Sequence, residues 1–106
     1  MSTTMPQYLE IFSTLTEEDR KAILDVGVAF RRVEIEKKLA RAQSIIQNFE
    51  KQFGMTFERL EEEGLPEDAD YRMHEDYISW SHYTRVAKKA QETLRALDAL
   101  SENRAG

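Results

Sequence analysis

The chain has 106 residues, a formal net charge of −5, 33% charged residues and no cysteine. This length suits one domain with one small core, and the lack of cysteine excludes disulfides and thiolate metal sites. With only four glycines and two prolines, and no strand-length alternation of β-branched and polar residues, the sequence predicts a single all-α domain over residues 1–106.

The start of the chain and its hydropathy bear on location. Residues 1–6 contain neither the basic segment nor the apolar run of a secretory signal. No apolar run approaches the roughly 18 residues that a membrane span requires. We therefore expect a cytoplasmic protein with no membrane partner.

Two helices are predicted in the first half of the chain. Residues 6–15 form a short helix that begins at Pro6. Thr16, followed by three acidic residues, is typical of the N-cap of a second helix. Only Gly27 interrupts good helical sequence over residues 17–53, and Gly54 marks the end of that long helix.

The long helix carries apolar residues on two sides. The first set has the seven-residue repeat of a coiled coil and requires a neighbouring helix; it comprises Leu24, Val28, Ile35, Leu39, Ala42, Ile46, Phe49 and Phe53. The second set, here called the apolar stripe, lies on the opposite side and comprises Ile23, Val26, Phe30 and Val33. One helix cannot cover both sides. The short N-terminal helix, a second subunit or a foreign protein must cover the stripe, so its four residues are candidate partner-binding residues.

Two further helices are predicted in the second half. Thr56 caps a short helix over residues 57–63, which Gly64 ends. A last helix over residues 67–100 begins at Pro66 or Asp70, and residues 101–106 form a frayed tail. The heptad positions of this last helix are Met73, Asp76, Trp80, Tyr83, Ala87, Ala90, Leu94 and Leu97. The predicted architecture is a long antiparallel, coiled-coil-like helical hairpin, with one short helix folded onto its open end and another at its closed end.

Negative charge is concentrated in one segment, here called the acidic end. Residues 58–76 contain nine acidic and two basic residues, a net charge of −7. Aromatic residues beside carboxylates suit recognition of a basic protein. The candidate partner-binding residues here are Glu61, Glu62, Asp68, Asp70, Tyr71, Tyr77 and Trp80, although Trp80 also has a core position in the heptad.

No catalytic, cofactor or metal site is predicted, so we expect no enzyme. His74 and His82 are eight residues apart, and no third ligand has metal-site spacing relative to them. Asp76 occupies a heptad position, where we expect it to pair with Arg59 or Lys51, or to set the register of the helices as a buried polar residue. The only cationic cluster, at residues 31–41, is interrupted by two glutamates, which disfavours a nucleic-acid partner.

One phrase of the sequence resembles a known class of proteins. Residues 49–61 (FEKQFGMTFERLE), an acidic stretch and the later Asp76-Tyr77-x-x-Trp80 are similar to small helical antitoxins encoded beside RNA-cleaving toxins. Phe53 and Leu60 stand where that family has tyrosine and phenylalanine. The resemblance covers roughly residues 16–97 and implies a type II antitoxin that binds its cognate toxin and blocks its RNA-binding surface.

Three functions remain open, in this order. The first is an antitoxin-like protein that neutralises a partner protein, as a homo-oligomer or a hetero-complex. The second is a self-associating coiled-coil scaffold or assembly protein, a dimer through the apolar stripe. The third is a DNA-binding regulator.

Overall fold

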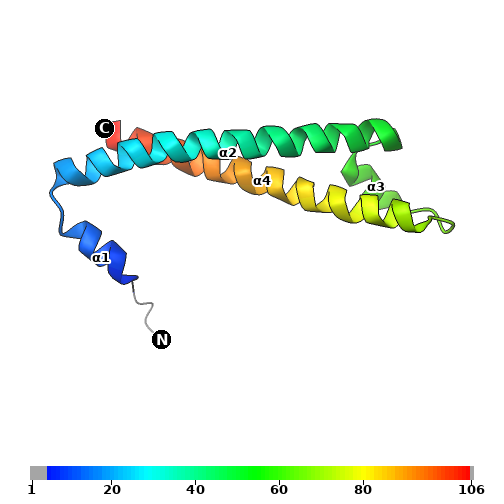
Figure 1. Cartoon of the computed structure of the whole chain (residues 1–106), viewed down its shortest axis with the longest axis horizontal. Helices are drawn as coiled ribbons and strands as arrows, with labels where there is room; N and C mark the ends of the chain where they lie inside the picture. Colours follow the sequence, from blue (N-terminus) through cyan, green and yellow to red (C-terminus); the bar gives the residue numbers. More distant parts are fainter. Residues whose placement is uncertain (1–4, 106) are drawn as a thin grey trace.

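The computed structural model describes residues 5–105, so the first residues of the segment examined for a signal sequence lie outside the described part. Four helices follow one another: α1 (Gln7–Ser13), α2 (Glu17–Phe53), α3 (Phe57–Glu63) and α4 (Tyr71–Ala105). No strand occurs among these described residues. The two long helices, α2 and α4, pack side by side as an antiparallel hairpin, and α3 lies at its closed end (Figure 1). The predicted all-α hairpin is confirmed.

Local sequence fixes the ends of α2 and α3. The Thr16 hydroxyl accepts a hydrogen bond of 3.0 Å from the backbone N–H of Asp19, and the Thr56 hydroxyl accepts one of 3.2 Å from that of Arg59. Each bond satisfies an N–H that the first helical turn leaves unpaired. Gly54 ends α2 with a φ of 69°, in the left-handed region that favours glycine. Both helices begin and end at the expected residues.

The bounds of α4 differ from our prediction at both ends. The helix begins at Tyr71, because the Asp70 carboxylate accepts a hydrogen bond of 2.9 Å from the N–H of Met73 and acts as its N-cap. Of the two predicted starts, Asp70 is therefore correct. The helix continues past Leu100 to Ala105, so the prediction of a frayed tail is wrong for residues 101–105. No glycine or proline occurs between Tyr71 and Ala105 to end the helix earlier.

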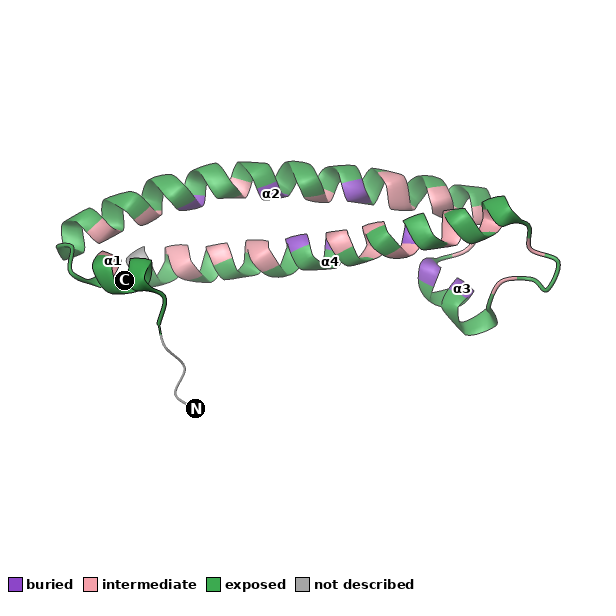
Figure 2. Ribbon diagram, turned by 60° about the horizontal axis from the view of Figure 1, so that its bottom comes forward, coloured by how far each residue is buried: buried purple, intermediate pink, exposed green. Residues whose placement is uncertain are grey.

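The core is the contact between the two arms. The buried apolar side chains of α2 and α4 occupy the predicted heptad positions: Val28, Ile35, Ala42, Trp80, Ala87 and Ala90. Figure 2 shows these buried residues, in purple, on facing sides of the arms. Alanines on both helices permit close approach of the backbones. The result is a thin rod, measuring 62 × 35 × 20 Å, with a radius of gyration of 20.0 Å.

The short helix α1 does not fold onto the hairpin, contrary to our prediction. It diverges from α2 at the open end (Figure 1), and none of its residues is buried. The Arg20 guanidinium on α2 donates hydrogen bonds to the backbone oxygens of Ser13 and Leu15, which fixes the turn between the two helices. With the turn in this conformation, α1 leaves the apolar stripe exposed.

Candidate protein-binding surfaces

The acidic end rests on a packed aromatic cluster. The Trp80 ring lies 5.7 Å from that of Phe49, 5.3 Å from that of Phe53 and 5.4 Å from that of Phe57, between ring centroids. The Tyr77 ring stacks on that of Phe57, at 5.7 Å between ring centroids. Aromatic pairs at these separations contribute stability beyond their buried area. The cluster joins α2, α3 and α4, so the carboxylates of α3 are held in place relative to both arms.

Trp80 is a core residue, and its inclusion among the partner-binding residues is wrong. It is 0% exposed, and its indole N–H has no hydrogen-bond partner among the described residues. The heptad position predicted this burial, while the neighbouring acids suggested a binding role. Packing decides between them, because Phe49, Phe53 and Phe57 enclose the ring from two other helices.

Four carboxylates of the acidic end have structural roles. Glu61 accepts a hydrogen bond of 2.8 Å from the Tyr77 hydroxyl, which ties α3 to α4. Glu63 pairs with Arg59 at 3.0 Å on α3. Asp70 is the N-cap of α4 described above. Asp76 accepts a hydrogen bond of 2.8 Å from the Gln52 amide of α2, so our predicted partners, Arg59 and Lys51, are wrong. Gln52 is the residue that the hairpin places opposite Asp76, a pairing invisible in the sequence of either helix.

Tyr71 of the acidic end and the adjoining Tyr77 both have raised pKa values. The hydrogen bond to Glu61, followed by partial burial and the negative charge of Glu61, raises the pKa of Tyr77 above its ordinary value of 10.0. A hydrogen bond to Glu75 raises the pKa of Tyr71 in the same direction. Tyr71 is nevertheless 78% exposed, so its ring is accessible to a partner, whereas Tyr77 is half-buried and joins α3 to α4.

The remaining carboxylates define what the acidic end offers to a partner. Glu58, Glu62, Glu67 and Asp68 are exposed and form no hydrogen bond or ion pair with other described residues. Glu58 and Glu62 are four residues apart on α3 and therefore share one face. Our predicted set included Glu62 and Asp68 but missed Glu58 and Glu67. Glu58 could have been predicted, because it lies four residues before Glu62 in the helix that Thr56 caps.

The apolar stripe remains uncovered. The side chains of Ile23, Val26, Phe30 and Val33 are 50–72% exposed, and neither α1 nor α4 covers them. Val28 and Ile35 on the other side of the same helix are buried against α4. Of the three predicted ways to cover the stripe, the short N-terminal helix is excluded. A second subunit and a foreign protein remain.

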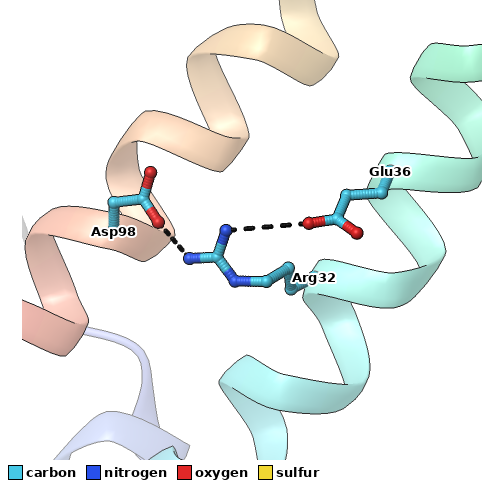
Figure 3. Close-up of polar contacts among 3 residues, drawn as sticks. All are labelled: Arg32, Glu36 and Asp98. Atoms are coloured by element: carbon cyan, nitrogen blue, oxygen red, sulfur yellow. Dashed lines mark hydrogen bonds and ion pairs between the residues drawn. The ribbon is translucent and has the colours of Figure 1, made fainter.

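An ion-pair network holds the open end of the hairpin on the side away from the stripe. The Arg32 guanidinium of α2 pairs with Asp98 of α4 and lies 3.8 Å from the Glu36 carboxylate (Figure 3). The network joins the two arms where no aromatic cluster supports them. It leaves the stripe on the opposite face of α2 free.

A cationic hollow between the arms was not predicted. Its volume is about 160 Å³, and Arg31 and Lys38 of α2 meet Lys89 of α4 around it. Arg31 pairs with Glu34 at 3.2 Å, whereas Lys38 and Lys89 have no ion pair among the described residues. The sequence spacing within α2 predicts only that Arg31 and Lys38 lie on the same face of that helix. Lys89 joins them through the register of the hairpin.

Among residues 5–105, no three or more His, Cys, Asp or Glu side chains form a group able to hold a metal ion. His82 stacks edge-on against Tyr83 at 5.0 Å between ring centroids. In the same described range, no helix combines the length and apolar character needed to cross a membrane.

Comparisons with known proteins give no identification. No family model, curated protein or solved structure matches the chain. The class that the fold defines is a helical hairpin with two exposed surfaces, the acidic end and the apolar stripe. The resemblance to antitoxins stays a prediction.

Proposed function

We propose that this protein is an antitoxin-like inhibitor that binds a basic partner protein, an RNA-cleaving toxin, through the acidic end. The observation that carries the proposal is a set of four exposed carboxylates, two on α3 and two in the loop that follows it. Glu58, Glu62, Glu67 and Asp68 have no partner among the described residues, and the aromatic cluster below them joins three helices. Tyr71, three residues after Asp68 in the chain, adds an exposed aromatic ring.

The charge of this surface suits the chemistry of such a partner. A protein that cleaves RNA binds a phosphate backbone with cationic side chains. A segment with a net charge of −7 attracts the same cations and speeds association with the surface that binds RNA. The aromatic cluster fixes the backbone of α3, which carries Glu58 and Glu62, so less conformational entropy is lost there on binding. Tyrosine is enriched at the centres of protein interfaces, a role that suits Tyr71.

A second function, a self-associating scaffold or assembly protein, is favoured by a different observation. The apolar stripe is exposed at the opposite end of the hairpin from α3. A surface of this kind covers itself when two copies meet. The two functions are compatible, since the acidic end and the apolar stripe share no residue.

Co-expression with the product of the adjacent gene, followed by a pull-down and an RNA-cleavage assay, tests the proposal. We expect a complex in which RNA cleavage is suppressed and whose affinity falls as salt rises. Failure to form a complex with any neighbour-encoded protein contradicts the proposal.

Charge reversal identifies the surface. Glu58→Lys combined with Glu62→Lys changes the charge of the free face of α3 by +4, and we expect binding to weaken by roughly 100-fold. The matched control is Glu92→Lys with Glu102→Lys, an equal change at exposed positions of α4 away from the acidic end. Equal loss of binding in both variants means that only the net charge matters, and this result excludes the acidic end as a specific site.

A further inference from the structure

The isolated chain exposes more surface than a compact protein of its size. Its accessible surface is 8419 Å², whereas a compact monomer of 12.4 kDa exposes about 6,100 Å². The radius of gyration of 20.0 Å compares with about 13 Å for a compact domain of this length. The excess of about 2,300 Å² exceeds the roughly 800 Å² that each partner buries in a standard interface. The chain therefore has ample area for a stable contact with a second molecule.

We propose that a second copy of the chain covers the apolar stripe, with the two α2 helices antiparallel about a two-fold axis at the level of Val28. The stripe has spacings of three, four and three residues, which are the same in both directions along the helix. Antiparallel pairing then places Ile23 opposite Val33 of the second copy, and Val26 opposite Phe30. Each large side chain meets another large side chain, and all four residues become buried in both copies.

Small residues beside the stripe permit the helices to approach closely. Gly27 and Ala29 flank it on its two sides, and both are exposed. A Cβ added at Gly27 meets nothing within 4 Å, and Gly27 does not have a positive φ. No contact among the described residues therefore requires glycine, although glycine in a helix costs about 1 kcal/mol relative to alanine. In the antiparallel pair, Gly27 lies beside Gly27 of the second copy, where absence of a side chain brings the backbones together.

Charges at the two ends of the stripe select the antiparallel direction. Asp19 and Lys37 continue the stripe by four residues at either end, and neither side chain forms an ion pair with other described residues. The antiparallel arrangement places Asp19 opposite Lys37 of the second copy, twice by symmetry. A parallel arrangement places Asp19 against Asp19 and Lys37 against Lys37, and like charges at such positions oppose pairing. The stripe is thus complementary to itself in one direction only.

The mass of the full chain in solution tests the proposal. We expect light scattering with size-exclusion chromatography to give twice the chain mass of 12.4 kDa. Phe30→Asp places a charge at the centre of the interface, and we expect it to raise the dissociation constant by about 30-fold or more. Ile78→Asp, at an exposed apolar residue of α4 outside the stripe, is the matched control and stays dimeric. A monomeric wild-type chain, or a dimer that Phe30→Asp does not weaken, overturns the proposal.

A distance measurement tests the direction. The chain has no cysteine, so Glu18→Cys provides a single site for a spin label. Antiparallel pairing separates the two labels by 20 residues along the helix axis, or about 30 Å. Parallel pairing leaves only the separation of the two helix axes, roughly 10 Å, and a distance of that size overturns the proposal. Since these readouts need no partner protein, their failure is distinguishable from failure to bind a toxin.

Discussion

The closed and open ends of the hairpin have different supports, although the same two helices form both. At the closed end, α3 adds a third element, and the aromatic cluster around Trp80 fills the space between three helices. At the open end, the arms meet through buried aliphatic residues and the ion pair between Arg32 and Asp98 (Figure 3). The comparison shows that a two-helix contact buries one side of each helix only. A third element, from the same chain or from another, is needed to cover a second side.

The largest effect is expected from removing the centre of the closed end. Trp80→Ala leaves a cavity among three aromatic rings, and we expect the free energy of unfolding to fall by about 3–5 kcal/mol. Chemical denaturation followed by circular dichroism measures the change. Tyr71→Ala, at an exposed residue of the same helix, is the control and leaves stability nearly unchanged. A loss below about 1 kcal/mol for Trp80→Ala contradicts the three-helix core.

Two valines on α2 separate the contribution of the hairpin from that of the apolar stripe. Val28 is 7% exposed and Val26 is 72% exposed. Val28→Asp buries an unpaired charge against α4, and we expect a loss of about 3 kcal/mol or more at every protein concentration. In Val26→Asp, the melting temperature should no longer rise with protein concentration, while the melting temperature of the dilute protein stays that of wild type. If both variants lose the same stability at high dilution, the stripe is covered within a single chain.

The contact between α3 and α4 is expected to depend on pH. The hydrogen bond from Tyr77 to Glu61 raises the pKa of Tyr77 in the folded protein above 10.0. A raised pKa favours the protonated phenol in the folded state, so this stability is complete below the unfolded value and is lost as pH rises through the folded value. We expect wild type, but not Tyr77→Phe, to lose this contribution in thermal melts taken above about pH 10. Identical pH dependence of the two proteins contradicts a role for this bond.

The smallest effect is expected at the open end. The ion pair between Arg32 and Asp98 is exposed on its carboxylate side, and such pairs contribute about 0–1 kcal/mol and weaken as salt rises. Asp98→Asn keeps the shape of the side chain and removes its charge. We expect a stability loss within that range in thermal melts at low salt, and none in 1 M salt. A larger, salt-independent loss means that the pair does more than join two solvated helix faces.

The sequence by itself determined the helices and the side of each that is buried. The Thr16 and Thr56 caps, the glycines at 54 and 64 and the heptad positions are local patterns, and each acts within a few residues of the chain. The start of α4 was less certain, because Pro66 and Asp70 both satisfy the local rules and only the hydrogen bond to Met73 selects Asp70.

Tertiary structure alone decided which residues of those patterns are available to a partner. Trp80 is enclosed by rings from two other helices, Asp76 meets Gln52, Lys89 joins Arg31 and Lys38, and α1 leaves the apolar stripe exposed. The fourth depends on the turn that the Arg20 hydrogen bonds fix, whereas the first three share one physical reason. A periodic pattern within one helix fixes which of its faces is buried. The register and direction of a second helix then fix which side chains of the two helices meet.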